Sequence, residues 1–388
     1  MLQLLNQIAI PRAVGTEGNN RIIQFQKKVF ENCGYSVKSI PFSCMVWSTA
    51  ESWLEWNDTN QKIMASPYSN DFHGEGIARI ARTLEELRGL PCEDAILFLT
   101  EEMAKEPLQP KDYPFYFPEA HKEMIDLLEE KNPLAIIAVT GKHPMCGLNP
   151  YPLFEDGNFH IPSAYMSVDE FEIIREDIRD KHVQVNIVSQ CTETVSQQIY
   201  ASKRVKNSKG KIVLCAHMDS KNQTQGALDN AAGIAVILKI AEILQLRNHD
   251  VDIVPFNTEE YYGANGELVY HDEIKDREDE IKLLINIDSV GHIGSKNAVS
   301  LYNIPEVLRQ RIEIIINKWE NTQLGEEWYA GDHMVFAFSG IPCITITSSD
   351  IAEGGLNHTH TMEDTIQTVD DTLLVEAVSF IEELFASL

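Results

Sequence analysis

Hydrophobic residues follow two kinds of spacing along this chain, and the spacing predicts where helices and strands lie. Helical spacing over residues 18–33 ends at Gly34, a common helix stop, and a strand is expected over residues 36–40. From about residue 194, apolar runs alternate with helical periods. The runs predict strands over residues 211–215, 252–256, 282–287 and 342–347, and the periods predict helices over residues 230–246, 305–319 and 370–385. This alternation indicates an α/β fold with a mixed, largely parallel central sheet and helices on both faces.

The segment between residues 45 and 190 has a different pattern. Its prolines are clustered, and its short β-like runs, at residues 95–99, 134–139 and 182–188, flank an amphipathic helix near residues 119–130. Short strands between proline-rich loops, without a cluster of reactive side chains, are typical of a separate β-rich domain. We therefore expect a discontinuous α/β domain, residues 1–44 and 191–388, with the β-rich residues 45–190 inserted into it.

The composition excludes several functions. The 388 residues contain 32 Lys and Arg against 59 Asp and Glu, a net charge of −27, which disfavours nucleic acids and anionic membrane surfaces as partners. The seven cysteines are scattered and form no C-x-x-C pair, so neither a disulfide framework nor a thiolate zinc site is expected.

The chain also lacks an apolar run of about 18 residues, so no transmembrane helix is expected. Its N-terminus has no basic region followed by a cleavage site, which favours a cytoplasmic location, with secretion after removal of a leader as the alternative. A homo-oligomer is left open.

Reactive side chains follow each of the four strands predicted after residue 194. These residues are His217, Asp219, Asp229, Glu259, Glu260, Asp288 and His360. Because ligands of an open α/β sheet bind beyond the carboxyl ends of its strands, we expect these side chains to converge. Structural histidines, helix-capping aspartates and surface glutamates would explain single members. The whole set would repel itself without a cation, so we predict a metal site.

The ligand types indicate which metal. Imidazole and carboxylate ligands without thiolate suit zinc best, with manganese or cobalt as substitutes. If Asp229, Glu260 and Asp288 are ligands, their three charges and one hydroxide balance two divalent ions. The spacing of His217 and Asp219 further predicts that Asp219 accepts the other ring N–H of His217.

These motifs resemble those of the M28 family of di-zinc aminopeptidases. The matching segments are His217-Met-Asp219, residues 226–233 (GALDNAAG), Thr258-Glu259-Glu260, Asn286-Ile-Asp288 and residues 360–365 (HTMEDT), together with residues 12–16 (RAVGT) and 331–336 (GDHMVF). The resemblance covers roughly residues 8–44 and 194–388. The middle segment is similar, more weakly, to the protease-associated domain that many members insert there.

The resemblance implies a fold of the zinc-exopeptidase type and a role for each site residue. Asp229 would bridge two zinc ions, with His217 and Asp288 completing one site and Glu260 and His360 the other. Glu259 would be the general base, and the peptide bond between Asp229 and Asn230 would be cis. His358 is a rival to His360 as the last ligand. The substrate would be a peptide that loses its N-terminal residue.

Other functions stay open on the sequence alone. Glutaminyl cyclisation and carboxypeptidase action use related folds, although no arginine cluster suited to a terminal carboxylate is visible. A metal-free binding module on the same fold is the alternative outside enzymes, and metal content distinguishes it.

Overall fold

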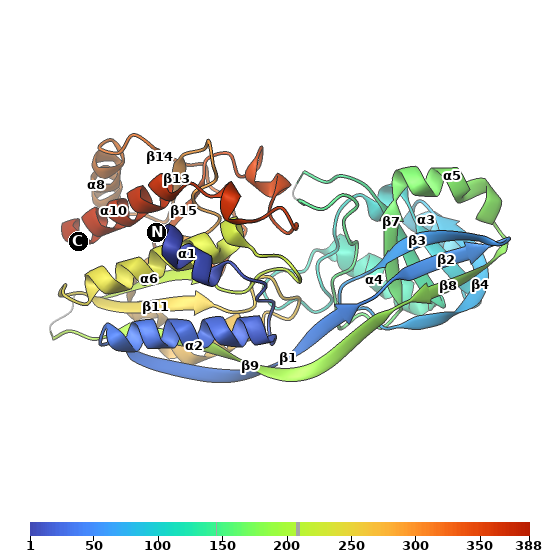
Figure 1. Cartoon of the computed structure of the whole chain (residues 1–388), viewed down its shortest axis with the longest axis horizontal. Coiled ribbons are helices and arrows are strands. Elements are labelled where there is room, and N and C mark those ends of the chain that lie inside the picture. Colours follow the sequence, from blue (N-terminus) through green and yellow to red (C-terminus); the bar gives the residue numbers. More distant parts are fainter. Residues whose placement is uncertain (145, 207–209) are drawn as a thin grey trace. The chain divides into compact units, whose positions relative to one another are not determined.

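The computed structural model describes residues 1–144, 146–206 and 210–388 and divides the chain into two compact units. Unit 1 comprises Met1–Cys44 and Val195–Leu388, and unit 2 comprises Met45–Thr194 (Figure 1). Both divisions fall inside long strands, β1 (Ser36–Thr49) and β9 (Ser189–Lys203). The sequence predicted only the beginning of β1, most of whose residues are exposed or half-buried. It missed β9, whose buried residues include the polar Ser189, Ser196 and Gln198.

Unit 1 is built on an eight-stranded sheet. Its strand order is β1-β9-β11-β10-β12-β15-β13-β14. The strands not yet given are β10 (Lys211–His217), β11 (Asp250–Phe256), β12 (Ile281–Ile287), β13 (Asn297–Tyr302), β14 (Thr322–Leu324) and β15 (Cys343–Ser348). Strand β10 pairs in parallel with β11 and β12, β12 pairs in parallel with β15, and β9 and β13 pair antiparallel to their neighbours β11 and β15. The mixed α/β class predicted from the sequence is confirmed.

Two hydrophobic cores cover the two faces of this sheet, because successive side chains of a strand point to opposite sides. Ile212, Leu214 and Ala216 of β10 belong to the larger core, whereas Val213 and Cys215 belong to the smaller one. The larger core also holds side chains of α1 (Leu2–Ile8), α2 (Glu17–Asn32), α6 (Ala232–Leu244), α8 (Glu306–Ile316) and α10 (Asp371–Ser387). The smaller core includes side chains of α7 (Asn265–Ile274) and α9 (Met334–Phe338).

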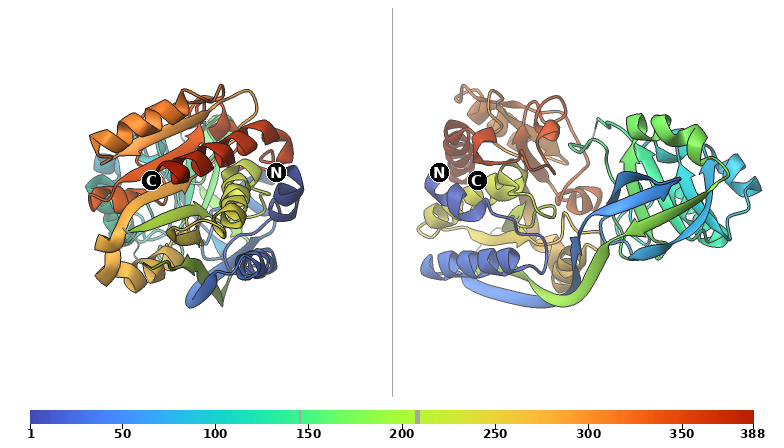
Figure 2. Two further views of the ribbon diagram at one scale, coloured as in Figure 1. Left: turned by 90° about the vertical axis from the view of Figure 1, so that its left-hand side faces the viewer. Right: turned by 45° about the vertical axis from the view of Figure 1, so that its right-hand side comes forward.

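The N-terminus of the chain meets the beginning of helix α10 in unit 1. The backbone N–H of Leu2 donates to Oδ1 of Asp371 at 2.8 Å, and the Met1 ammonium lies 3.2 Å from the same oxygen. Helix α1 therefore begins where α10 begins, and the left view of Figure 2 shows both helices at the same side of the sheet.

Unit 2 contains a closed barrel with the strand order β2-β3-β7-β6-β5-β4-β8. The strands are β2 (Ser52–Trp56), β3 (Thr59–Ala65), β4 (Phe72–Ala81), β5 (Ala95–Leu99), β6 (Ala135–Thr140), β7 (Ser163–Ser167) and β8 (His182–Ile187). Its helices are α3 (Leu84–Gly89), α4 (Glu119–Lys131) and α5 (Val168–Ile178). The identity of this unit as a protease-associated domain stays a prediction.

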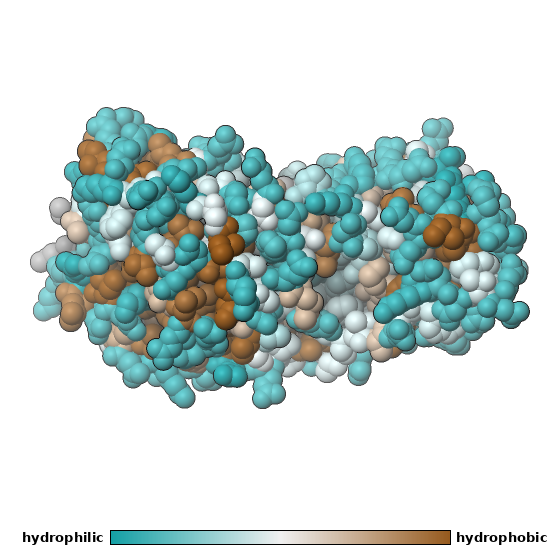
Figure 3. Space-filling model, turned by 45° about the horizontal axis from the view of Figure 1, so that its top comes forward, coloured by the Kyte–Doolittle hydropathy of each residue, from teal (hydrophilic) through white to brown (hydrophobic). Residues whose placement is uncertain are grey.

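Hydrophilic side chains cover most of the face drawn in Figure 3, as the acidic composition leads one to expect, and hydrophobic side chains appear in scattered groups. In the part of the chain that the structure describes, no helix is both long and apolar enough to span a bilayer.

Candidate metal centre

The parallel strands of unit 1 bring their carboxyl ends to one edge of the sheet. His217 is the last residue of β10 and lies in register with Phe256, the last residue of β11. Asp288 directly follows β12, and the loop after β15 leads to His360. The side chains predicted to converge therefore start from neighbouring strand ends, as the sheet topology requires.

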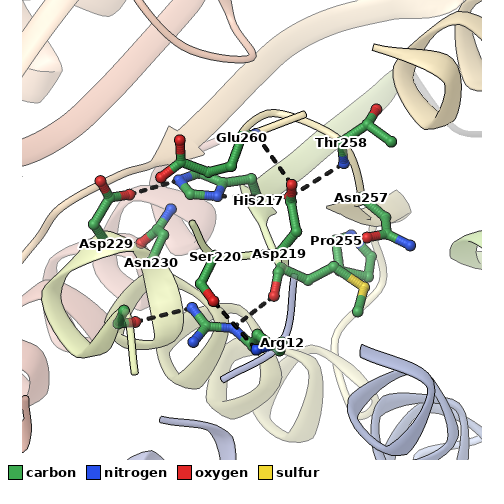
Figure 4. A network of polar contacts seen from close by, with 12 residues as sticks. Arg12, His217, Asp219, Ser220, Asp229, Asn230, Pro255, Asn257, Thr258 and Glu260 are labelled. Atoms are coloured by element: carbon green, nitrogen blue, oxygen red, sulfur yellow. Dashed lines mark hydrogen bonds and ion pairs between the residues drawn. The ribbon is translucent and has the colours of Figure 1, made fainter. Parts of the chain in front are cut away.

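Three of these residues form a first group. Nε2 of His217 lies 2.9 Å from Oδ1 of Asp229 and 3.5 Å from Oδ1 of Asp288. All three residues are buried, and one ligand atom of each lies within 4.8 Å of the others. Figure 4 shows the His217 ring facing Asp229.

A second group shares Asp229 with the first. Nε2 of His360 lies 3.1 Å from Oδ2 of Asp229 and 3.0 Å from Oε1 of Glu260. Oδ1 of Asp229 thus faces the first group, and Oδ2 faces the second. His358 belongs to neither group: its ring lies 5.5 Å from that of His292, and its Nδ1 is 3.7 Å from Glu363.

The charges and donor atoms of both groups fit divalent cations. Burial lowers the pKa of His217, but the surrounding carboxylates, Glu259 first, outweigh it and raise this pKa well above its usual value. For His360, Glu260 and Asp229 outweigh burial in the same way. Positive charge therefore stabilises both groups. A divalent ion would supply this charge and leave the imidazole rings neutral, which is the form that binds metal.

A buried carboxylate oxygen supports the same conclusion. Apart from the charge pair with Nε2 of His360 at 3.0 Å, Oε1 of Glu260 has no hydrogen-bond partner among the described residues. An unpaired buried carboxylate oxygen is costly unless a cation or proton satisfies it. The nitrogen and oxygen donors, without sulfur, are those that zinc accepts.

The loop that carries Asp229 is held by hydrogen bonds on both sides. Asp364 accepts the backbone N–H groups of Leu228 at 2.7 Å and Asp229 at 3.1 Å. Burial raises the pKa of Asp364 to about 6, against the effect of these two hydrogen bonds. Asn230 donates to the carbonyl of Ile287 at 2.8 Å, which ties the loop to the end of β12. The predicted cis peptide between Asp229 and Asn230 is present.

Asp219 does not make the hydrogen bond predicted for it. Its Oδ1 lies 3.9 Å from Nδ1 of His217, which is too long, and among the described residues that nitrogen has no partner. Both Asp219 oxygens are instead occupied by backbone N–H groups, of Thr258 at 3.1 Å and Glu260 at 3.0 Å (Figure 4). Asp219 therefore positions the loop that presents the two glutamates.

Glu259 stands at the border of the cluster. It is half-buried, unlike its buried neighbour Glu260. Burial, Glu260 and Asp288 raise the pKa of Glu259 well above its usual value, although His217 opposes them. A carboxylate that is shifted in this direction holds a proton more readily than a free glutamate does.

Sequence reasoning gave no role to Arg12, which the structure places beneath the site (Figure 4). Its guanidinium is fully buried and donates to the backbone carbonyls of Met218, Gln225 and Gly226. The backbone N–H of Arg12 donates to Oγ of Ser220 at 3.2 Å. Arg12 thus ties both ends of the loop between His217 and Asp229. The motif around Arg12 was visible in the sequence, but its partners are carbonyls, which no sequence pattern identifies.

Two further buried acids, Glu267 and Asp332, were also given no firm role. Oε1 of Glu267 and both carboxylate oxygens of Asp332 have no hydrogen-bond partner among the described residues. Burial, and then the other acids of the cluster, raise the pKa of both carboxyl groups well above the usual value. The surroundings of the first group are therefore strongly acidic.

Comparisons with known proteins find a family model that matches part of this chain. Residues 198–384 match the sequence model of peptidase family M28. Leucine aminopeptidase 2 of Trichophyton equinum is 26% identical over 154 residues, which cover 37% of this chain. The chain spans only 31% of the length of that relative.

Similar solved structures extend over both units. An aminopeptidase from Aneurinibacillus sp. strain AM-1 is 18% identical, with a TM-score of 0.75, and the match covers 99% of this chain and 92% of that chain. A zinc aminopeptidase from Bacillus subtilis is 17% identical, with a TM-score of 0.73 and coverage of 99% and 93%. Glutaminyl cyclase from Porphyromonas gingivalis is 16% identical, with a TM-score of 0.50 and coverage of 100% and 95%. At these identities the matches show a shared fold.

Proposed function

We propose that this protein is a metal-dependent aminopeptidase of peptidase family M28, which removes N-terminal residues from peptides with the help of two zinc ions. The observation that carries the proposal is the pair of three-residue groups that share Asp229. A single aspartate with one oxygen toward each group is the arrangement that two neighbouring cations need. The match of residues 198–384 to the family and the likeness in fold to aminopeptidases support the same reaction.

The proposed ligands fall into two sets, one for each ion. His217, Asp229 and Asp288 would hold one ion, and Asp229, Glu260 and His360 the other. When bound, the ions would supply Lewis acidity, which lowers the pKa of a water molecule and polarises the scissile carbonyl. Manganese or cobalt would be a substitute with similar ligand preferences.

Glu259 is the residue we assign to proton transfer. It would take a proton from the attacking water and return it to the leaving amine. The raised pKa of Glu259 favours this role, since a base with a pKa nearer to neutral can both accept and release the proton. Asp219 does not reach the reacting atoms in this scheme: by accepting the N–H groups of Thr258 and Glu260, it holds the loop on which Glu259 lies.

The substitution Glu259→Gln tests the proposal. It should leave about two zinc ions per chain, measured by inductively coupled plasma mass spectrometry, and lower kcat by about 10²- to 10⁴-fold. Asp229→Ala should empty both sites. Glu353→Gln changes an exposed glutamate of the same unit and serves as the control. Full turnover by the Glu259 variant would remove the assigned base.

A panel of aminoacyl-nitroanilides, assayed with chelator and again after zinc is restored, tests the reaction class. We expect hydrolysis that the chelator abolishes and zinc restores. Glutaminyl cyclisation is the second candidate, favoured by the shared fold with the cyclase, and peptides with N-terminal glutamine would reveal it. A protein that binds no zinc and turns over no substrate would be the metal-free binding module.

A further inference from the structure

Lys221 is a basic residue in contact with one proposed metal ligand. Its Nζ lies 3.3 Å from Oε2 of Glu260 and donates to the backbone carbonyl of the same residue at 3.3 Å. The other oxygen of this carboxylate, Oε1, faces His360 at 3.0 Å. The two oxygens of Glu260 are therefore divided between a lysine ammonium and the second ligand group.

The position of Lys221 is fixed by its own backbone. Its carbonyl accepts hydrogen bonds from the N–H and the hydroxyl of Thr224, at 3.2 and 2.9 Å, and from Oγ of Ser220 at 3.3 Å. Ser220 in turn accepts the N–H of Arg12. The side chain of Lys221 is 23% exposed, whereas that of Glu260 is 5% exposed, so the ion pair is poorly screened by water.

The two ligand groups consequently differ in their electrostatic surroundings. In the first group, Asp229 and Asp288 face the ring of His217. In the second group, the ammonium of Lys221 lies 3.3 Å from a carboxylate oxygen of Glu260. A cation in the second group would therefore be opposed by a neighbouring positive charge.

We propose that Lys221 is a positioning residue that weakens the site formed by Asp229, Glu260 and His360, so that the site formed by His217, Asp229 and Asp288 fills first and holds its ion more tightly. The ammonium pairs with Oε2 of Glu260, whereas Oε1 faces His360. The ammonium would also repel a cation held by this group. This inference rests on the proposed function, because it assumes that both groups bind zinc.

Zinc titration of the 388-residue apoprotein, by calorimetry and by competition with a chromophoric chelator, tests the inference. We expect two binding steps in the wild type that differ in affinity at least about tenfold. Lys221→Gln should tighten the weaker step about tenfold, as expected for loss of one charge a few ångströms away at a largely buried site, and change the tighter step by less than about threefold. Lys221→Arg, which keeps the charge, should resemble the wild type, and so should Lys239→Gln, which changes a lysine paired with Glu242 on helix α6.

Assignment of the steps uses Asp288→Asn, which removes a ligand of the first group only. The remaining step in this variant should have the weaker affinity, and Lys221→Gln added to it should tighten that step. Unchanged or weaker binding in the Lys221→Gln variants, with two zinc ions still bound, would overturn the inference and leave the proposed function intact. If wild-type protein with an intact thermal unfolding transition binds no zinc, the proposed function itself fails.

Discussion

Replacement of Arg12 by Met would remove the clamp beneath the proposed metal centre. The guanidinium donates four hydrogen bonds to backbone carbonyls, at 2.6 Å to Met218, 2.5 Å to Gln225, 2.9 Å to Gly226 and 3.3 Å to Ile10. Burial lowers the pKa of Arg12 to about 10, although nearby carboxylates, Asp364 first, oppose burial, so the group still carries its charge at neutral pH.

The size of the effect follows from opposing contributions. Hydrogen bonds to a charged donor contribute about 1.5–3 kcal/mol each, but loss of the buried charge also removes a desolvation cost of several kcal/mol. Removal of one partner from a buried charged network costs about 3–5 kcal/mol, and we adopt about 4 kcal/mol. For a unit of this size, that loss lowers Tm by roughly 10 °C.

Differential scanning calorimetry of Arg12→Met, with the exposed Arg21→Met as control, measures this change. Because Arg12 ties the loop that joins His217 to Asp229, the variant should also bind zinc more weakly, which the chelator competition would detect. A Tm within about 2 °C of the wild type, together with unchanged zinc affinity, would refute the reasoning.

Two further predictions concern the packing of unit 1. Burial lowers the pKa of His271 from its usual 6.5 to about 4. As the pH falls, the unfolded chain therefore takes up a proton before the folded protein does. The contribution of His271 to stability is present above pH 6.5 and is lost as the pH falls toward 4. Between pH 7.5 and 5, the free energy of unfolding, measured by urea denaturation, should fall by about 2 kcal/mol less in His271→Phe than in the wild type. The control His182→Phe, at an exposed position, should show the same pH dependence as the wild type. Equal pH dependence in all three proteins would contradict the assignment. A Cβ on Gly233 would lie 2.6 Å from the carbonyl oxygen of Ile287, so Gly233→Ala should lower the free energy of unfolding by about 1–3 kcal/mol in the same assay. The control Gly89→Ala, with no atom within 4 Å of the added Cβ, should be nearly neutral. Similar values for both variants would contradict the predicted steric clash.

The sequence was sufficient to locate the central strands of unit 1 and the residues that meet at their ends. Those strands are buried on both faces, so they are continuous apolar runs, and each predicted run lies within or next to a strand of the structure. Strand β1 was shortened because most of its residues are exposed or half-buried, and β9 was missed because its apolar run, residues 199–201, is short and its other buried residues are polar. Side-chain alternation alone was too weak a signal there.

Contacts within the site were predictable only in part. The convergence of His217, Asp229 and Asp288 follows from topology, since parallel strands end at one edge. The partner of Asp219 does not follow from topology, because a two-residue spacing does not fix whether its carboxylate faces a ring or a loop backbone. In the structure the N–H groups of Thr258 and Glu260 take that position.

The junction of the first and last helices, where Leu2 meets Asp371, has a consequence for biosynthesis. Chains emerge from the ribosome N-terminus first, and the barrel of unit 2 is completed well before the segment that returns to pair with the beginning. All five proposed metal ligands come after unit 2 in the chain, and the last of them is His360. A product that terminates before His360 would lack one proposed metal ligand and is therefore expected to be inert rather than weakly active.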